Sequence, residues 1–574
     1  MVENREVAAI LEEVADILEI MGDNPYKIRA YRKASHSIHK LAEDLEDIRQ
    51  QGRLLEISGI GKAIQSKVEE ILRTGSLTYH QELLRQVPRG VLKMLTLPGM
   101  GPRTVRVIHE HLGITNLEDL LEAAKARRIR QLPGLGAKTE YNIKKGMELL
   151  HSIGETVTLG TVFPLAQDFC AFLGEGEGVE SAELVGSIRR RKPVVHDIDI
   201  LVASSQPEMV QERIGRDRRL KSLEEVTDEV IRGRIGLGFK FEVIVVAPSD
   251  FPIALLLATG SKEHREMLLA RLQEKGVTSG NSEAEIYQKI GIQWIPPELR
   301  ENRGEIEQAA SQRLPSLISQ TELKGDLHMH TDWTDGAHNL EQMVEQAQAM
   351  GYSYIAITDH SQSLKISRGL DERRLQDQLD LITQMNMGLK DFRILSGIEV
   401  DIMRDGTLDF PDGILEQLDV VVASIHSSFH LSLEEQTHRI ISAINNPNVD
   451  IIGHLTGRLL NRRAGYQVDI DRVLKAASRR GTALEINAHP DRLDISEEVA
   501  IRARQEGVKV AINSDAHQVG DMLLMEYGVF NARRGWLEAR DVINTWPLEE
   551  LLQYFKNKPN QVNHTKRGEI TGRA

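Results

Sequence analysis

Short apolar runs that end in a potential metal-ligating side chain recur between residues 325 and 517, and they constrain the fold more than any other feature of this chain. The runs are rich in valine and isoleucine, which is typical of strands buried on both faces. Polar-apolar stretches at 338–350, 371–389 and 496–506 separate the runs and predict helices. Alternating strands and helices predict an α/β barrel, in which the C-terminal ends of the strands meet at one mouth.

The candidate ligands are imidazoles and carboxylates with no thiolate: His328, His330, Asp335, His360, Glu399, His426, His454, Asp515 and His517. This donor set suits Zn²⁺, Mn²⁺ or Fe²⁺. Nine ligands are too many for one ion and suit two or three. Clustered divalent ions activate a water and neutralise a phosphoester during hydrolysis. One histidine at a strand end is usually an ordinary polar residue, but seven separate placements indicate a metal cluster.

These residues lie in motifs that resemble the polymerase-and-histidinol-phosphatase (PHP) domain family, from residue 323 to about 560. The motifs include Asp-Leu-His-Met-His-Thr, Thr-Asp-His, Gly-Ile-Glu-Val-Asp and Ser-Asp-Ala-His. The resemblance implies a distorted (β/α)7 barrel and three ion sites. The implied sites are His328, His330, Glu399 and Asp515 for one ion, Glu399, His426 and His454 for a second, and Asp335, His360 and His517 for a third.

Composition limits the setting in which the chain works. The single cysteine, Cys170, excludes an internal disulfide and suits a reducing cytosol. No apolar run approaches the roughly 18 residues of a membrane helix, and the N-terminus is unlike a signal peptide. We therefore expect a cytoplasmic protein with no membrane partner, and a monomer. The net charge of −14 disfavours a nucleic-acid partner, but basic clusters at 27–33, 125–130 and 189–192 matter more than the total.

Residues 1–150 are predicted to be mostly helical and to repeat one short turn three times. The turn carries paired glycines, which are Gly59 and Gly61, Gly99 and Gly101, and Gly134 and Gly136. Glycine permits positive φ and close backbone approach, and the helix after each turn offers free N–H groups to a phosphate. One copy would be an ordinary turn between two helices. Three copies indicate the helix-hairpin-helix pattern, which binds a DNA backbone without reading its sequence.

The first segment also resembles the small N-terminal domain of family X DNA polymerases. The resemblance rests on Asn24-Pro-Tyr-Lys-Ile-Arg-Ala-Tyr-Arg-Lys-Ala and Gly59-Ile-Gly-Lys-Ala-Ile-Gln-Ser-Lys67. It implies that Lys67 is the Schiff-base lysine of a deoxyribose-phosphate lyase. The alternative is that Lys67 only contacts a DNA phosphate.

The segment Gly186-Ser187-Ile-Arg-Arg190, followed by a strand carrying Asp197-Ile-Asp199, resembles the nucleotidyltransferase palm. A period of two places both carboxylates on one strand face, where they can share a pair of Mg²⁺ or Mn²⁺ ions. The turn would bring backbone amides to a triphosphate, and Arg190 would neutralise it. The resemblance implies that Gly260, in Thr-Gly-Ser-Lys, also contacts the nucleotide.

Several palm positions depart from the family pattern. The third carboxylate falls on Glu242 where an aspartate is expected, and Glu242 reaches about one methylene farther, so that it can misplace a metal. An expected arginine is Ile244, the nucleotide-sugar aromatic falls on Leu257–Ala258, and an expected asparagine is Arg265. The thumb is shortened near residue 275. The barrel ligands, in contrast, are complete.

The predicted fold class is a multidomain α and α/β protein. It comprises a lyase-like domain at 1–85, helix-hairpin-helix fingers at 86–152, an α+β nucleotidyltransferase palm and thumb at 153–300, a linker at 301–322 and the barrel at 323–574. This order of parts resembles bacterial family X DNA polymerases. It implies a DNA repair enzyme that adds dNTPs to gapped, nicked or 3′-end-bearing duplex and hydrolyses 3′ ends with two or three Mn²⁺ or Zn²⁺ ions. The alternatives are a nuclease whose palm only holds DNA, a non-catalytic DNA-binding scaffold, and a small-molecule phosphatase.

Overall fold

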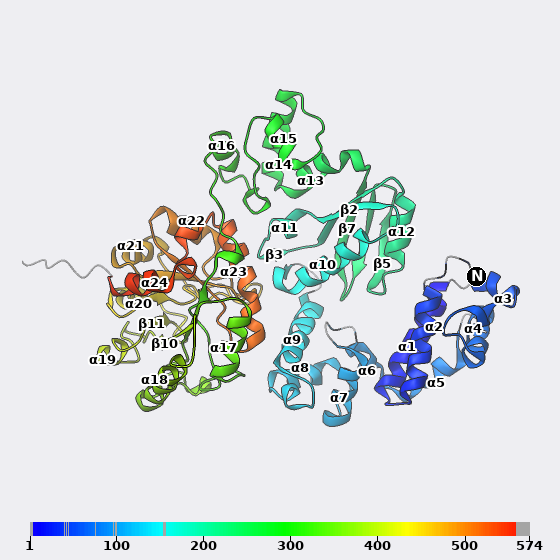
Figure 1. The fold of residues 1–574 in the computed structure, drawn as a ribbon, viewed down its shortest axis with the longest axis horizontal. Helices are drawn as coiled ribbons and strands as arrows, with labels where there is room; N and C mark the ends of the chain where they lie inside the picture. Colours follow the sequence, from blue (N-terminus) through cyan, green and yellow to red (C-terminus); the bar gives the residue numbers. More distant parts are fainter. Residues whose placement is uncertain are drawn as a thin grey trace, which may run out of the picture. The chain divides into compact units, whose positions relative to one another are not determined.

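The computed structural model describes residues 4–557 apart from 40, 42, 44, 75, 96, 98, 99 and 153–155 (Figure 1). The chain forms two compact units. The first comprises Met1–Glu155, Asp168–Ala182 and Val202–Val245, and the second comprises Thr156–Gln167, Glu183–Leu201 and Val246–Ala574. The finer division into five domains stays a prediction. Among the described residues, no helix is both long enough and apolar enough to cross a membrane.

The N-terminal part of the first unit is helical, as predicted. Helix α1 shows why, because Val7, Leu11, Val14 and Leu18 recur at helical spacing and are fully buried. Gly22, with φ +73°, makes the turn into the second helix. The helices are α1 (Asn4–Ile20), α2 (Pro25–His39), α3 (Leu45–Gln50), α4 (Lys62–Thr74), α5 (Thr78–Gln86), α6 (Arg89–Met94), α7 (Pro102–Leu112), α8 (Leu117–Lys125) and α9 (Ala137–Ser152).

A β-meander completes the first unit. Strands β5 (Leu220–Val226), β6 (Val230–Ile235) and β7 (Phe239–Val246) pair antiparallel, beside helix α12 (Pro207–Gly215). Alternate residues of β7 are buried, as expected for a strand with one solvated face. These strands belong to a five-stranded sheet of order β2-β4-β7-β6-β5, with β2 at Val179–Leu184 and β4 at Ile198–Ser204.

The second unit begins with short elements of the predicted palm and a small helical cluster. Strands β1 (Val157–Thr158) and β3 (Val194–Val195) pair antiparallel, and helix α10 spans Leu159–Gly174. Helix α11 (Gly186–Arg189) directly precedes β3. Helices α13 (Phe251–Thr259), α14 (Lys262–Lys275), α15 (Glu283–Lys289) and α16 (Glu305–Ala310) share one apolar core. Helix α16 lies within the segment predicted to be a linker.

The predicted barrel is confirmed. Its seven strands pair in parallel and in chain order, with helices around them (Figure 1). The strands are β8 (Gly325–Asp326), β9 (Tyr354–Ile357), β10 (Arg393–Asp401), β11 (Val420–Ser424), β12 (Ile451–Ile452), β13 (Ala483–Asn487) and β14 (Val510–Asn513). The helices are α17 (Leu340–Ala349), α18 (Glu372–Asn386), α19 (Asp412–Leu415), α20 (Leu433–Asn445), α21 (Ile470–Arg480), α22 (Glu497–Gln505), α23 (Met525–Arg534) and α24 (Leu548–Lys556). Helices α17, α18 and α22 occupy the three stretches predicted from the sequence.

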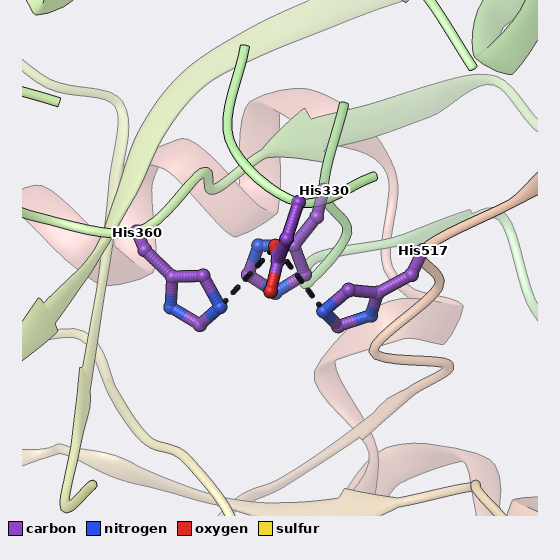
Figure 2. A group of neighbouring side chains, drawn as sticks. His330, His360 and His517 are labelled. Atoms are coloured by element: carbon purple, nitrogen blue, oxygen red, sulfur yellow. Dashed lines mark ion pairs between the residues drawn. The ribbon is translucent and has the colours of Figure 1, made fainter. Parts of the chain in front are cut away.

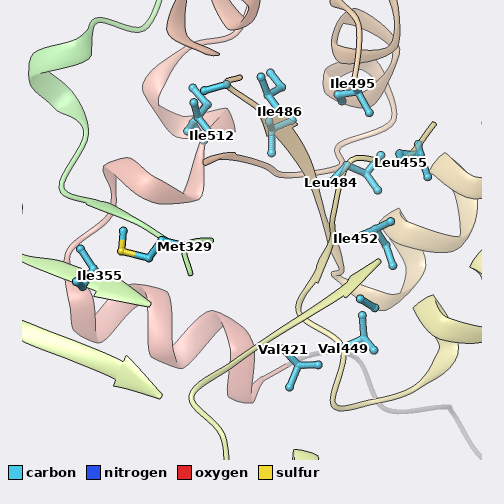
Figure 3. Close-up of a cluster of buried hydrophobic side chains, with 14 of the residues drawn as sticks. Met329, Ile355, Val421, Val449, Ile452, Leu455, Leu484, Ile486, Ile495 and Ile512 are labelled. Carbon is cyan, nitrogen blue, oxygen red and sulfur yellow. The ribbon is translucent and has the colours of Figure 1, made fainter. Parts of the chain in front are cut away.

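The barrel strands are apolar because both of their faces are covered. On one face, residues such as Ile355, Ile452 and Ile512 pack against the surrounding helices (Figure 3). On the other face, Tyr354 and Ala356 belong to a second cluster that includes residues of α24. Burial on both faces explains the continuous apolar runs seen in the sequence. Side chains at the strand ends are then the first that can turn toward a polar site.

One β-bridge, between Met329 and Ala516, links the chain after β8 to the chain after β14 and closes the barrel. The His330 amide donates to the Ala516 carbonyl at 2.8 Å. The Ser514 hydroxyl donates to Asp326 across the same seam. The seam therefore lies between the two stretches that carry the paired candidate ligands of β8 and β14.

Candidate metal centre and nucleotide site

The strand ends bring the nine candidate ligands together at one mouth. Glu399 lies within β10, and the other eight follow β8, β9, β11, β12 and β14. His330, Asp335, His360 and His517 each offer a ligand atom within 4.8 Å of the others. Figure 2 shows the imidazoles of His330, His360 and His517 close together. Asp335 Oδ1 lies 3.5 Å from both His360 Nε2 and His517 Nε2. Two further groups satisfy the same criterion, which are His328 with His330 and Asp515, and His360 with Glu399 and His426.

Glu399 lies at the centre of the ligand set and uses both oxygens. Its Oε1 lies 3.4 Å from His328 Nε2, 3.3 Å from His426 Nε2 and 3.1 Å from His454 Nε2. Its Oε2 lies 2.7 Å from His360 Nδ1. One carboxylate thus faces the ligands of more than one implied ion, which is the arrangement expected of a bridging ligand.

Several polar atoms of this centre are buried without a hydrogen bond of suitable geometry, which is costly unless another group satisfies them. Among the described residues these atoms include His328 Nε2, His330 Nε2, Asp335 Oδ1, His360 Nδ1 and Glu399 Oε2. Imidazole nitrogens and carboxylate oxygens oriented in this way fit divalent ions. The residues present therefore fit the metal cluster that the sequence predicts.

Protonation in this centre is uneven, because burial would lower the pKa of His360 and of His426 but Glu399 outweighs burial and raises these values to about 10 and about 9, so that metal binding must displace a proton from each. Burial would raise the pKa of Glu399, but nearby His426 and His328 outweigh burial and hold that pKa well below its usual range. Burial together with His517 and His360 lowers the pKa of His330 to about 3. A charged carboxylate and a neutral imidazole are the forms that bind a metal.

Backbone strain marks two of the candidate ligands. His454 has φ +25° and Asp515 has φ +52°, a region that residues other than glycine rarely adopt. Such strain costs on the order of 1–3 kcal/mol per residue and gathers at functional sites. The strained conformation of His454 and Asp515 orients their side chains toward the mouth of the barrel.

A layer of residues that the sequence did not single out orients the ligands. Glu485 Oε1 lies 2.7 Å from His328 Nδ1, and Asp401 Oδ1 lies 2.5 Å from His426 Nδ1. Asn487 donates to Asp515 Oδ2 at 2.9 Å. A carboxylate on the second nitrogen of a ligand histidine fixes its tautomer and its ring orientation. The usable sequence signal is a carboxylate inside an otherwise apolar strand, as in Ala-Leu-Glu485-Ile-Asn.

Gly186 and Asp199, two of the predicted palm residues, lie directly against each other. Gly186 has φ +59°, and a Cβ there would lie 2.1 Å from Asp199 Oδ2. Only glycine therefore lets the turn approach this carboxylate so closely. Asp199 lies in β4 and Asp197 directly precedes it, while Ser187 is partly buried in α11.

Two further predicted nucleotide ligands are found in tightly packed surroundings. Arg190 is 9% exposed, and its guanidinium donates to Glu301 at 2.9 Å and to the Thr259 carbonyl at 2.7 Å. Gly260 follows α13, and a Cβ there would lie 2.6 Å from the ring of His264. The Arg190 guanidinium is thus already bonded to protein groups.

Glu242, the predicted third carboxylate, has a protein partner in the first unit. It stands opposite Arg232 in the register of β6 and β7, and Arg232 Nε donates to its Oε2 at 2.5 Å. Arg232 also pairs with Glu225 on β5. A cross-strand arginine therefore competes with any metal for this carboxylate.

Lys67 lies half-buried on α4 beside Tyr79, with Nζ 5.2 Å from the ring centroid. Lys27 Nζ lies 2.6 Å from the Tyr79 hydroxyl and 2.8 Å from Asp23 Oδ2. Lys27 and Lys67 thus both lie against the Tyr79 ring, and two neighbouring positive charges favour the binding of an anion. Tyr79 was not among the candidate site residues predicted from the sequence.

The hairpin glycines fall into two kinds. Gly59 and Gly134 have φ values of +92° and +73°, which explains the need for glycine. Gly61, Gly101 and Gly136 directly precede α4, α7 and α9, and a Cβ at any of them would meet nothing within 4 Å. The space beside these three glycines is therefore not filled by other atoms of the chain, and their role in binding a DNA phosphate stays a prediction. Gly99 lies outside the described residues.

Comparisons with known proteins agree with these parts. A helix-hairpin-helix domain model matches residues 2–77, a SAM-like helix-hairpin-helix tandem matches 91–148, and a PHP domain matches 326–489. The "DNA polymerase/3'-5' exonuclease PolX" of Bacillus subtilis (strain 168) is 35% identical over 571 residues, covering 96% of this chain and 99% of that protein. A "probable phosphatase" of Thermoanaerobacter sp. (strain X514) is 33% identical over 248 residues, covering 41% of this chain and 96% of that protein.

Proposed function

The chain belongs to the family of the DNA polymerase/3'-5' exonuclease PolX, and from this membership we propose that it is a DNA repair enzyme that extends and hydrolyses DNA 3′ ends. One observation carries the proposal, which is that similarity to this relative runs over 96% of the chain and includes both the palm and the barrel. Gapped, nicked or 3′-end-bearing duplex is the proposed DNA substrate, with dNTPs as the second substrate. We further propose that the enzyme acts as a monomer in the cytoplasm.

We assign hydrolysis to the barrel. Two or three Mn²⁺ or Zn²⁺ ions held by the nine ligands would supply a Lewis acid for the phosphoester and a water of lowered pKa. The chain itself contributes ionised Glu399 and Asp515, neutral His330, and the carboxylates that orient the ligand rings. Burial of these groups keeps bulk water away from the reacting phosphate.

We assign nucleotidyl transfer to the palm, with Asp197 and Asp199 holding Mg²⁺ or Mn²⁺. The backbone of Gly186 and Ser187 would bind the triphosphate beside Asp199. Glu242 would be the third carboxylate once it leaves Arg232. Lys67, beside Tyr79, is the proposed lyase nucleophile, or otherwise a phosphate contact.

A nuclease whose palm only holds DNA is the second candidate, and two observations favour it. Glu242 is paired with Arg232, and Arg190 is buried against Glu301. A small-molecule phosphatase fits less well, because the phosphatase relatives cover only 41% of this chain and do not account for the helix-hairpin-helix matches at 2–77 and 91–148.

A labelled gapped duplex tests the proposal directly. The purified protein is incubated with this duplex, with and without dNTPs, in Mg²⁺ and in Mn²⁺. We expect shortening of the 3′ end without dNTPs and filling of the gap with them. Shortening alone would favour the nuclease that only holds DNA, and the absence of both reactions would favour a scaffold.

The hairpin helices provide a prediction about DNA affinity. Gly61→Val should weaken DNA binding about tenfold and reduce its salt dependence, because the new side chain covers the N-terminus of α4 and removes phosphate contacts. Folding should be retained, since a Cβ at Gly61 meets nothing within 4 Å. Equilibrium binding to a gapped duplex at several salt concentrations measures the effect. Gly413→Val, at an equally open glycine of the barrel, is the control, and equal affinity of both variants would contradict the assignment.

Glu242 provides a prediction about rate. Glu242→Asp should raise the rate of primer extension about threefold, because the shorter side chain loosens its bond to Arg232 and returns the carboxylate to the length that the family pattern expects. Single-turnover extension on gapped DNA measures the rate. Glu225→Asp shortens the other partner of Arg232 and should leave the rate unchanged. A lower rate in Glu242→Asp would show that the longer side chain is the functional one.

A further inference from the structure

The palm turn that carries the predicted nucleotide ligands is bonded to a helix of the barrel. This turn, residues Gly186–Lys192, is called the 186–192 turn below. Arg534, the last residue of α23, is 1% exposed, and its Nη1 donates to the Arg190 carbonyl at 2.7 Å and to Glu301 Oε1 at 2.9 Å. Arg190 Nε donates to the same Glu301 oxygen at 2.9 Å. Two guanidinium groups therefore share one carboxylate, and one of them also holds the turn by its backbone.

The barrel fixes Arg534 from the other side. Its Nη2 donates to Glu497 Oε1 at 2.8 Å, and Glu497 is the first residue of α22. Glu497 is itself 6% exposed. Charge-assisted hydrogen bonds in a buried setting are short and directional, so Arg534 has little freedom to move. It thus transmits the position of α22 and α23 to Arg190.

Arg191, the next residue of the 186–192 turn, makes a second contact with α23. The Arg191 guanidinium carbon lies 4.5 Å from the ring centroid of Phe530 on α23 and 4.3 Å from that of Phe163 on α10. Arg191 has φ +58°, an unfavourable backbone conformation for arginine that must be held by its surroundings. A cation between two aromatic rings provides such a contact.

Hydrogen bonds within the 186–192 turn connect its two ends, so that a displacement of one end also displaces the other. The Lys192 amide donates to the Ser187 carbonyl at 3.0 Å, and the Arg191 amide donates to the Ile188 carbonyl at 2.9 Å. Movement of Arg190 and Arg191 therefore moves Ser187 and its neighbour Gly186. Gly186 in turn lies against Asp199, since a Cβ added to Gly186 would lie 2.1 Å from Asp199 Oδ2. The contacts form an unbroken chain from the barrel helix to the catalytic carboxylate.

We propose that Arg534, a residue of the hydrolase barrel, is a positioning residue for nucleotide binding in the palm. The inference rests on the proposed nucleotidyl transfer and adds that the barrel supports that reaction independently of its own hydrolysis. Arg534 does this by fixing the Arg190 backbone and the Glu301 carboxylate, while Phe530 fixes Arg191. A barrel with no hydrolytic activity is then still required for efficient use of dNTPs.

The test compares Arg534→Lys and Phe530→Leu with the control Arg533→Lys in the full-length protein. These changes keep the charge or the apolar character, so that the barrel should still fold. Arg533 is the adjacent residue, and it bonds Glu298 and the Ile318 carbonyl instead. Two quantities are measured, which are amide hydrogen exchange in residues 186–192 and the KM for dNTP in gap filling. Hydrolysis of a single-stranded 3′ end is measured alongside.

We expect Arg534→Lys and Phe530→Leu to speed exchange in the 186–192 turn about tenfold and to raise the KM for dNTP by a similar factor, with kcat for hydrolysis within about twofold of the parent protein. Arg533→Lys should change neither quantity. Unchanged exchange in the turn, or equally faster exchange throughout the barrel strands, would overturn the proposal. If the parent protein fills no gap, the proposed nucleotidyl transfer fails, and the exchange measurement still decides whether Arg534 holds the turn.

Discussion

Replacing Asp515 is expected to abolish hydrolysis of DNA 3′ ends while leaving primer extension intact. The loss should reach about a thousandfold, because Lewis-acid stabilisation is worth several kcal/mol and each 1.4 kcal/mol is a factor of ten in rate. Asp515 Oδ1 lies 3.2 Å from His330 Nε2 and 3.7 Å from His328 Nε2, so that its removal would take an anionic ligand from the ion that these two histidines would hold. Extension should stay within about twofold, because Asp197 and Asp199 are unaffected.

The choice of substitution matters at this position. Asp515 has φ +52°, and asparagine tolerates that conformation better than alanine does. Asp515→Asn therefore tests the lost charge with the backbone preserved, and Asp515→Ala tests the lost ligand. Asp377→Asn, at an exposed position on α18, is the matched control. Hydrolysis is measured on a labelled 3′ end together with bound metal by elemental analysis. Unchanged hydrolysis in both Asp515 variants, at full metal content, would refute the assignment of the first ion site.

The second large effect is expected in the palm. Asp199→Asn in the Asp515→Asn background should lower gap filling by about a thousandfold, because the metal pair loses a shared anionic ligand. DNA affinity should be unchanged, since the hairpin helices provide the phosphate contacts. Single-turnover incorporation of one dNTP measures the rate, and Asp250→Asn, at an exposed residue of the same unit, is the control.

Two results would alter this interpretation of the palm. Robust incorporation by Asp199→Asn would refute the assignment of the site itself. No incorporation by the Asp515→Asn parent, with DNA still bound, would identify the palm as a holder of DNA for the nuclease. Gly186→Ala is an independent check, because the added methyl would lie 2.1 Å from Asp199 Oδ2 and should lower incorporation to a similar extent.

The barrel could be predicted from the sequence because its chemistry repeats locally. The nine ligands lie at the ends of only six short apolar runs, so that a strand and its site residues are predicted from the same few positions. Strand β13 was not singled out, since its carboxylate, Glu485, stands inside the run and bonds His328 from there. The glycine turns were likewise local signals, and Gly59 and Gly134 adopt the positive φ that they suggested.

The remaining features depend on contacts between distant parts of the sequence. Arg190 and Arg534 are 344 positions apart, and neither motif nor periodicity connects them. The pairing of Glu242 with Arg232 follows from the register of two strands, which a one-residue shift would abolish. Tyr79 is an ordinary aromatic in the sequence and becomes notable only when Lys27 and Lys67 lie against it. Such residues are found from three-dimensional packing alone.

The closing bridge of the barrel has a thermodynamic consequence. Met329 lies between His328 and His330, and Ala516 lies between Asp515 and His517, so that candidate ligands flank the Met329–Ala516 bridge on both sides. An ion held by both segments would bind the barrel only while the Met329–Ala516 bridge is closed. Ion binding would therefore stabilise the closed bridge, and closure of the bridge would strengthen ion binding. Metal affinity and resistance of the seam to local unfolding should therefore rise and fall together. Loss of the ions would first open the joint between the first and last strands and leave the pairings between neighbouring strands of the seven-stranded sheet in place.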